Sequence, residues 1–444
     1  MRFSLSGIHV PHRKNTADMA AVRMAPPELV TIPTSMHIGK PASPSVKVGD
    51  KVFVGTLLAS QDGFVSAPVY SSVSGTVKSV SPFTVASGQT VTAITVASDG
   101  NMTPDPSIEP PVIDSREALV AAIRSSGTVG LGGAGFPTYV KFSVPEGKEI
   151  DELIVNGAEC EPYITSDTRT MIDKSADMRR AIDTILRFMP IKRVIIGIES
   201  NKRAAIESVR RMAEGEPRID VRVLKSVYPQ GGEKVLIYHL TGKVVPAGKL
   251  PLDVGCIIVN CTTLACIGNY IATGMPLVSK CVTVDGGAVA SPKNVIAPIG
   301  TAISEVIAFT GGFKSEPAKV LLGGPMMGYS ITSLDLPIMK NTNAVIAFDE
   351  SEAKPKRETA CIRCGSCAAH CPLCLNPAAF MRAYKRGDVA ELERLRIDIC
   401  MECGCCSYIC PAGQPLVEVN KLSKQQYREY LAEKKAKEGA VNGK

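Results

Sequence analysis

Two runs of cysteine near the C-terminus constrain this chain more than any other feature of its sequence. The spacing C-x2-C-x2-C-x3-C-P begins at Cys361 and occurs a second time from Cys400. Chains with two such runs hold two [4Fe–4S] clusters, and the fourth cysteine of each run ligates the cluster of the other run. The ligands predicted for one cluster are Cys361, Cys364, Cys367 and Cys410, and those predicted for the other are Cys400, Cys403, Cys406 and Cys371.

The spacing has a physical reason. Two residues between successive thiolates let three of them surround one cube of iron and sulfide within a single turn of chain. The proline after the fourth cysteine breaks that turn and directs its thiolate to the neighbouring cube. Zinc is the alternative, but zinc sites usually take their four ligands as two separated pairs. Three thiolates and a fourth marked by proline favour iron and sulfide, and they indicate electron transfer.

At 444 residues the chain is long enough for about three domains. Ten of its 15 cysteines lie between Cys361 and Cys410. Metal-ligand spacing without a secretory signal predicts a reducing cytoplasm rather than disulfides. Part of the net charge of +7 comes from a basic C-terminal stretch, which we expect to be a solvated helix and tail. An anionic membrane surface or an acidic partner is the alternative, and no nucleic-acid motif is present.

Residues 254–279 form an uncharged stretch that is long enough for a membrane-spanning helix. Three glycines, Pro276 and polar residues such as Asn260 and Thr262 interrupt it. Lipid would leave those polar groups unsatisfied, so a helix buried in protein beside a ligand pocket explains them better. We therefore expect a chain without a membrane span.

Residues 1–100 contain short apolar runs separated by Gly-Asp and Ser-Gly turns, a pattern that predicts short strands. VKVGD at residues 46–50 and SAPV at 66–69 resemble the motifs of biotinyl/lipoyl-type barrel-sandwich domains. The carrier lysine of that family would lie near residues 70–72, where this chain has Tyr-Ser-Ser. A structural or docking role therefore remains for this part.

A proline-rich linker at residues 101–111 precedes a predicted helix that is capped by Asp114 or Ser115 and ends near Arg124. The next loop, GLGGAGFP at residues 130–137, matches the dinucleotide fingerprint G-x-G-x-x-G as a letter pattern. That fingerprint should follow a strand, and here it follows a helix, so the match alone is weak. Its glycines still allow backbone N–H groups to approach a phosphate at the start of the next helix.

From Asp151 onward, predicted strands alternate with predicted helices, which indicates a parallel sheet with helices on its faces. Ligands of such sheets collect at the carboxyl ends of the strands. Glu159, Glu161 and Glu233 lie just after strands and are therefore candidates for a ligand site. The alternative is that these carboxylates are solvated loop residues.

Two smaller parts complete the chain. Residues 281–350 predict a compact β–α–β unit, in which GGPMMG at 323–328 is a turn or a ligand contact. Residues 377–385 and 389–397 predict two short helices between the cysteine runs.

Four motifs resemble, in the same order, those of the NADH-binding subunit of respiratory complex I. GLGGAGFPTYVK at residues 130–141 is similar to that family's flavin loop GRGGAGFPTGxK, and NGAECEP at 156–162 is similar to NADEGEP. QGGEK at 230–234 and NCTTLA at 260–265 are similar to CGEE and NVETLA. The resemblance implies a bound FMN beside a nicotinamide pocket, followed by a soluble-ligand-binding β-grasp domain.

The order of the parts resembles the C subunit of the Rnf family of ion-translocating ferredoxin:NAD oxidoreductases, along essentially the whole chain. SGIHVP at residues 6–11 and HIG at 37–39 also resemble that family. The alternative is the cobalamin reductase of propanediol-using bacteria, which shares the flavin and ferredoxin parts but usually begins at the flavin domain.

The predicted fold class is multidomain α/β and α+β. We expect an N-terminal β barrel-sandwich at residues 1–100 and a Rossmann-like FMN/NAD(H)-binding domain at 112–280. A β-grasp domain is expected at 281–350, and a two-cluster, ferredoxin-like helical domain at 355–430.

The resemblance also assigns contacts residue by residue. Glu159 and Glu161 would be catalytic residues that orient the nicotinamide nucleotide. The FMN contacts that it implies are Gly132, Gly133, Gly135, Lys141, Asn156, Glu233, Asn260 and Thr263. Ala158, Lys234 and Thr262 replace acidic residues of the family motifs, so no flavin contact is carried over to them.

The implied function is electron exchange between NAD(H) and ferredoxin through FMN and the two clusters. A flavin fits between them because it exchanges both hydride pairs and single electrons. The resemblance implies an enzyme subunit bound peripherally to the cytoplasmic side of the cell membrane, with membrane and iron–sulfur subunits as partners. Those membrane subunits would translocate the ion. The alternative is a cluster-carrying docking subunit without NAD(H) turnover of its own.

Overall fold

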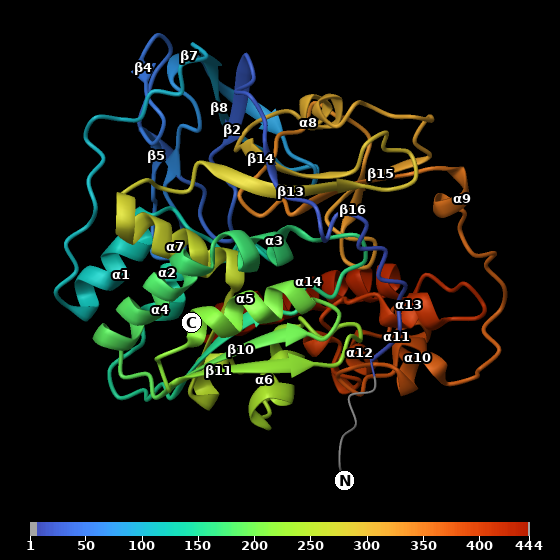
Figure 1. Ribbon diagram of the computed structural model, residues 1–444. Coiled ribbons are helices and arrows are strands. Elements are labelled where there is room, and N and C mark those ends of the chain that lie inside the picture. The colour runs from blue at the N-terminus through green and yellow to red at the C-terminus, as the bar shows by residue number, and fades with distance from the viewer. Residues whose placement is uncertain (1–6, 443–444) are drawn as a thin grey trace. The chain divides into compact units, whose positions relative to one another are not determined.

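The computed structural model describes residues 7–442, with side chains described as far as residue 437, so Ser6 of the SGIHVP motif lies outside it. The chain divides into two compact units, and Figure 1 labels many of their helices and strands. The sheet unit contains residues 12–225 and 251–353, and the cysteine unit contains residues 7–11, 226–250 and 354–442. The segment 226–250, which we expected inside the flavin domain, therefore packs with the cysteine runs.

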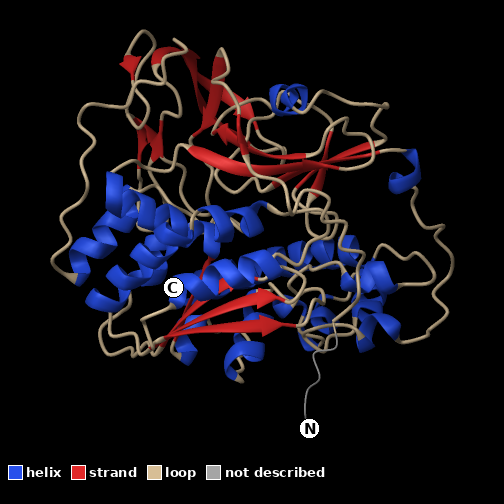
Figure 2. Cartoon of the chain, in the orientation of Figure 1, coloured by secondary structure: helices blue, strands red, loops and turns tan. Residues whose placement is uncertain are grey.

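Two small antiparallel sheets form the N-terminal part of the sheet unit (Figure 2). One sheet has the strand order β2-β8-β7-β4 and the other has the order β3-β5-β6. Their strands are β2 (Leu29–Pro33), β3 (Ser43–Pro44), β4 (Lys51–Val52), β5 (Leu57–Ser60), β6 (Val69–Tyr70), β7 (Gly75–Thr84) and β8 (Thr90–Ser98). Both sheets contribute to one apolar core, in which Ile32 and Ile94 of the first meet Leu58 and Val69 of the second.

The hairpin that carries lysine in lipoyl-type domains is buried here. Ser72 Oγ donates to the Ile299 carbonyl oxygen at 2.5 Å, and the Tyr70 hydroxyl donates to the Ser125 carbonyl oxygen at 2.5 Å. Beside it, Lys340 Nζ donates to the Pro68 and Gly127 carbonyl oxygens at 2.6 and 2.7 Å. Burial lowers the pKa of Lys340 to about 7. A hairpin held on several sides in this way is consistent with docking and not with a swinging arm.

A four-stranded parallel sheet with the order β11-β10-β9-β12 confirms the predicted strand–helix alternation. Its strands are β9 (Glu152–Gly157), β10 (Arg193–Glu199), β11 (Ile219–Leu224) and β12 (Cys256–Asn260). Its helices are α3 (Ser166–Asp173), α4 (Ser175–Phe188), α5 (Arg203–Ala213) and α7 (Cys261–Thr273). The strand order reverses at β9, because β10 lies on one side of it and β12 on the other. In such sheets the carboxyl ends of the two strands at the reversal form the ligand crevice.

Two helices precede this sheet. The predicted cap is confirmed: Ser115 Oγ accepts from the Ala118 N–H at 3.1 Å and begins α1 (Arg116–Ser125). The glycine loop then leads into the short helix α2 (Thr138–Phe142).

The prediction of one buried helix across residues 254–279 is wrong. The stretch begins at the end of the short helix η1 (Pro251–Val254), continues as β12 and α7, and enters β13 after Gly274 ends α7 in a left-handed conformation (φ +72°). Its apolar character reflects a buried edge strand and a packed helix. Within residues 7–442, no helix has both the length and the apolar character needed to span a bilayer.

A six-stranded mixed sheet with the order β1-β14-β13-β17-β15-β16 completes the sheet unit. Its strands are β1 (Val22–Arg23), β13 (Ser279–Asp285), β14 (Lys293–Pro298), β15 (Lys319–Leu322), β16 (Tyr329–Ile331) and β17 (Ala344–Phe348). The helix α8 (Ile303–Phe309) packs into its core, and the short helix α9 (Glu350–Ala353) follows β17. The edge strand β1 comes from the N-terminal segment, which local sequence patterns did not predict.

The cysteine unit is helical. Its elements are α6 (Glu233–Thr241), α10 (Ser366–Ala369), α11 (Pro377–Lys385), α12 (Val389–Arg394), η2 (Ile397–Ile399), α13 (Cys405–Ile409) and α14 (Leu416–Asn442). The helix predicted at 377–385 is confirmed. The one predicted at 389–397 ends at Arg394, and the short helix η2 follows it.

Candidate functional site

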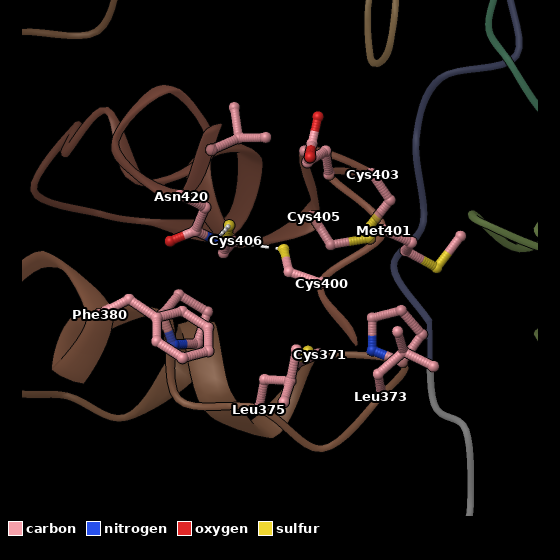
Figure 3. A pocket seen from close by; sticks show the side chains of 15 residues that line it. Cys371, Leu373, Leu375, Phe380, Cys400, Met401, Cys403, Cys405, Cys406 and Asn420 are labelled. Atoms are coloured by element: carbon pink, nitrogen blue, oxygen red, sulfur yellow. Dashed lines mark hydrogen bonds between the residues drawn. The ribbon is translucent and has the colours of Figure 1, made fainter. Parts of the chain in front are cut away.

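Five cysteine side chains from both runs line one cavity of the cysteine unit (Figure 3). Cys371 closes the first run, whereas Cys400, Cys403, Cys405 and Cys406 lie in the second, and all of these except Cys405 are predicted ligands of one cluster. The other walls of the cavity are largely apolar and include Leu373, Leu375, Phe380 and Val417. Crossed ligation requires this meeting of one first-run thiol with three second-run thiols.

The remaining predicted ligands lie nearer the surface. Cys410 is buried and Cys367 is half-buried, and both belong to an apolar cluster that also contains Met381 and Cys406. Cys361 and Cys364 are exposed. The site predicted for the first cluster is therefore open to solvent on one side, whereas the site predicted for the second is enclosed.

The buried thiols fit a cationic group. Burial is the main cause that raises the pKa of Cys371 to about 11. Backbone hydrogen bonds oppose this rise, and the charges of Cys403 and Cys400 add to it. Burial likewise raises the pKa of Cys400 and Cys406. Thiolates so placed need positive charge among them, which the iron of a cluster supplies. No three His, Cys, Asp or Glu side chains within residues 7–442 converge as the ligands of a single metal ion do.

Two further cysteines lie close to these ligands. Cys405 is buried, and its thiol donates to the Tyr228 carbonyl oxygen at 3.9 Å. The Tyr228 hydroxyl in turn donates to the Cys403 carbonyl oxygen at 2.7 Å. Cys374 is exposed. Tyr228 lies two residues before the QGGEK motif, so this motif and the second-run cysteines belong to one packed structure.

The glycine loop lies beside the end of β12. A Cβ atom on Gly132 would lie 2.5 Å from Asn260 Nδ2, whereas one on Gly133 would meet nothing within 4 Å. Gly135 has a left-handed φ of +73°, which favours glycine. The loop is anchored by the Leu131 N–H, which donates to Thr263 Oγ1 at 3.0 Å. The open face at Gly133 can therefore approach a ligand through its backbone.

Asn260 and Asn156 lie at the same level of the sheet, as paired residues at the carboxyl ends of β12 and β9. Asn260 Oδ1 caps α7 by accepting from the Thr262 and Thr263 N–H groups at 2.9 and 3.2 Å. Lys141 Nζ donates to the Ile258 carbonyl oxygen of β12 at 2.9 Å. Most of the residues that the resemblance assigns to FMN thus lie together where the strand order reverses, at the carboxyl ends of β9 and β12.

An acid that the sequence analysis missed lies at this point. Asp167 Oδ2 accepts from Asn260 Nδ2 at 2.7 Å, and Asp167 Oδ1 accepts from the Thr262 hydroxyl at 2.6 Å. Thr262 stands where the family motif has glutamate, so this chain places a carboxylate beside Asn260 from a different helix, α3. No local motif points to Asp167, because its neighbours in space are 93 and 95 residues away in sequence.

The carboxylates of Glu159 and Glu161 both accept hydrogen bonds from backbone N–H groups of this chain. Glu159 has φ +47° and accepts from the Asp167 N–H at 2.6 Å and the Thr168 hydroxyl at 2.5 Å, at the start of α3. Glu161 accepts from the Met326 and Met327 N–H groups at 3.0 and 2.8 Å, and burial raises its pKa to about 7. Glu161 therefore holds the GGPMMG turn, and neither carboxylate is a solvated loop residue.

Glu233 lies elsewhere. It begins α6 in the cysteine unit, whereas the other residues assigned to FMN lie in the sheet unit.

A buried lysine from the N-terminal segment organises the loop that carries the two glutamates. Lys14 Nζ donates to the carbonyl oxygens of Glu159, Glu161 and Ile164 at 2.9, 2.7 and 2.5 Å. Burial lowers the pKa of Lys14 to about 8, although the charge of Glu159 opposes this. Lys14 lies within residues 1–100, which were predicted to form the barrel-sandwich domain, and no spacing signal connects it to residues 159–164.

We expect Lys14→Met to destabilise the sheet unit by about 3–5 kcal/mol, because it leaves buried carbonyl groups unpaired and removes a positive charge that stabilises the buried Glu159 carboxylate. Arg13→Met is the matched control, since the Arg13 side chain is 54% exposed in its ion pair with Glu352 and its loss should cost about 1 kcal/mol or less. Urea unfolding followed by circular dichroism measures both. Equal losses in the two variants would contradict the role given to Lys14.

Four family models match consecutive parts of the chain. The RnfC barrel sandwich hybrid domain matches residues 3–101, and the Nuo51 FMN-binding domain matches residues 123–269. An SLBB domain matches residues 281–330, and a 4Fe-4S dicluster domain matches residues 358–439. The predicted fold class is confirmed by these matches and by the sheets described above.

Curated relatives resemble the chain over most of its length. One is the C subunit of the Na(+)-translocating ferredoxin:NAD(+) oxidoreductase complex of Acetobacterium woodii, 40% identical over 84% of this chain and 85% of the relative. The C subunit of the proton-translocating complex of Clostridium ljungdahlii is 38% identical over 84% of this chain and 82% of its own. The C subunit of the ion-translocating oxidoreductase complex of Rhodobacter capsulatus is 36% identical over 96% and 84%.

Proposed function

The chain belongs to the family of the C subunits of ion-translocating ferredoxin:NAD oxidoreductase complexes, and on that premise we propose that it exchanges electrons between NAD(H) and ferredoxin. It does so through FMN and two [4Fe–4S] clusters, as one subunit of a larger membrane-bound complex. The observation that carries this proposal is the meeting of Cys371 with Cys400, Cys403 and Cys406 in a chain that also has the glycine loop beside the ends of β9 and β12.

The glycine loop and its neighbours suit a flavin phosphate or ring. When bound, FMN exchanges a hydride with nicotinamide and single electrons with a cluster. The open face at Gly133 brings backbone N–H groups to the ligand. Gly132 lets the loop lie close to Asn260 at the end of β12, and Gly135 lets it lie close to Met36 and His37. Lys141 adds positive charge beside the loop, and Asn156 and Asn260 offer amide groups at the crevice.

This chain lacks acidic residues of the family motifs, and Asp167 supplies a carboxylate that supports flavin binding in their absence. Its carboxylate is held by Asn260 and Thr262 next to the crevice, where the glutamate of the family motif would otherwise lie. Glu159 and Glu161 act, in this proposal, by fixing the loop that orients the nicotinamide nucleotide.

In this proposal the thiols of both runs hold the two clusters, which exchange single electrons with the partner subunits. Membrane and iron–sulfur subunits of the complex are the partners that we propose, with the chain bound peripherally at the cytoplasmic side of the membrane. Ion translocation belongs to the membrane subunits of such a complex.

We expect the purified chain, supplied with FMN, to reduce ferricyanide with NADH. This reaction needs the flavin and nicotinamide sites but neither ferredoxin nor a membrane, so it separates an NAD(H)-using subunit from a docking subunit that only carries clusters. The control is the chain without added FMN. A flavin-loaded chain that binds no NADH and reduces no ferricyanide would favour the docking role.

A further inference from the structure

A buried asparagine from α14 contacts the sulfur atoms of the enclosed cysteine site. Asn420 Nδ2 donates to Cys400 Sγ at 3.6 Å and to Cys406 Sγ at 3.9 Å (Figure 3). Its side chain is 1% exposed. Asn420 thus directs an N–H donor at two of the four predicted ligands that line this cavity, from a helix that contains none of them.

The two polar atoms of the Asn420 amide differ in their hydrogen bonding. Asn420 Oδ1 is buried and has no hydrogen-bond partner among the described residues. A buried amide that leaves its oxygen unpaired is unfavourable unless its amino group gains elsewhere. The contacts of that amino group are the two sulfur atoms, so they are where the gain must lie.

The surroundings strengthen such hydrogen bonds. Leu373, Leu375, Phe380 and Val417 line the same cavity and keep its polarity low, and an N–H dipole acts more strongly on nearby charge in such a medium. Reduction adds one negative charge to an iron–sulfur cluster. Hydrogen bonds to its sulfur atoms stabilise that charge and are among the factors that set its reduction potential.

The pseudo-symmetry of the two runs provides an internal comparison. Asn420 follows Cys410 by ten residues, and Met381 follows Cys371 by ten residues. Met381 belongs to an apolar cluster that contains Cys367 and Cys410, predicted for the other site, and also Cys406 of the enclosed site. The residue ten positions after the fourth cysteine is thus an amide in one run and a thioether, which has no N–H, in the other.

The other site has a different donor. The exposed Cys364 takes a side-chain hydrogen bond from Ser366. Water competes with donors at an exposed surface, whereas it is excluded around Asn420. The effect of one added or removed donor is therefore expected to be larger in the enclosed site.

We propose that Asn420 is a potential-setting residue, which raises the reduction potential of the cluster held by Cys371, Cys400, Cys403 and Cys406 through hydrogen bonds to its sulfur ligands. The inference rests on the proposed function in one respect, that these thiols hold a [4Fe–4S] cluster. The reduction that it concerns adds one electron to the cluster from an external donor, and no covalent bond forms or breaks. Asn420 acts through the ligands and does not itself ligate iron.

The test exchanges the two residues. Asn420→Met removes the N–H donor from the enclosed site, and Met381→Asn adds one to the other site. Lys424 Nζ holds the Cys400 carbonyl oxygen at 2.9 Å from the next turn of α14, so the ligand backbone stays anchored in Asn420→Met. Met381→Leu is the matched control, because it changes the shape of the side chain without adding a donor.

The measurement is a dithionite titration of the purified full chain, with redox mediators, followed by paramagnetic resonance. The signals are assigned with Cys361→Ser and Cys400→Ser variants. We expect Asn420→Met to lower the midpoint of the enclosed cluster by about a tenfold change in its reduction equilibrium, which is about 59 mV for one electron. Met381→Asn should raise the midpoint of the other cluster, and Met381→Leu should leave both unchanged.

The outcomes separate this inference from the proposed function, because NADH takes no part in the titration. An unchanged midpoint of the enclosed cluster in Asn420→Met, with iron content intact, would overturn the role of Asn420. If that variant loses the cluster instead, Met381→Asn decides. A raised midpoint supports tuning by an amide at this offset, and an unchanged one overturns it. Absence of any iron–sulfur signal in the unmodified chain would refute the proposed function itself.

Discussion

Cys371→Ser is expected to remove the cluster held by Cys400, Cys403 and Cys406, and not the cluster of its own run. The reason is geometric, because Cys371 lines the same cavity as the three second-run thiols, whereas Cys367 packs beside Cys410. Anaerobically purified chain should contain about eight iron atoms and eight sulfides, and the variant should keep about half of them. Iron and sulfide analysis measures the loss, and paramagnetic resonance of the reduced protein shows which signal disappears.

Cys374→Ser is the matched control for this prediction. Cys374 lies three residues after Cys371 but is exposed and falls outside the repeated spacing, so both clusters should survive its change. Loss of the Cys361–Cys367 cluster in Cys371→Ser would mean that each run closes on itself. Stoichiometric zinc in place of iron would remove the basis of both expectations.

Gly133→Leu is expected to abolish flavin binding while the chain stays folded. A Cβ atom at Gly133 meets nothing within 4 Å in the protein, so the new side chain occupies the space through which the loop backbone approaches its ligand. A side chain at Gly132 would instead collide with Asn260 and disturb the cap of α7, which would confuse folding with binding. Flavin released by acid or heat and measured by fluorescence gives the bound amount.

The control measurements for Gly133→Leu are iron content and circular dichroism, both of which should match the unmodified chain. Gly133→Ala is the graded comparison, because a methyl group fills much less of the open face and should weaken flavin binding less. Full flavin content in Gly133→Leu would mean that the glycine loop faces away from the flavin.

Features with a local physical cause could be predicted from the sequence. The ligand sets, which stay a prediction, follow from the cysteine spacing, because the geometry of a cubane cluster acts within one turn of chain and the proline marks where the chain leaves it. The Ser115 cap depends on groups three residues apart. Alternation of strands and helices in residues 151–280 also indicated a parallel sheet correctly, because each strand and each crossover helix has its own apolar pattern.

What only the tertiary structure decided depends on groups far apart in the chain. Residues 226–250 pack with the cysteine runs, and Glu161 pairs with backbone groups 165 residues away. Lys14 holds the loop after β9 and Asp167 contacts Asn260, and both come from segments without a recognisable motif. The uncharged stretch at 254–279 divides into a strand and a helix. A buried charged side chain must find hydrogen-bond partners, and the fold decides which backbone N–H or carbonyl groups lie near it. Sequence spacing does not show which groups these are, because they are distant in the chain.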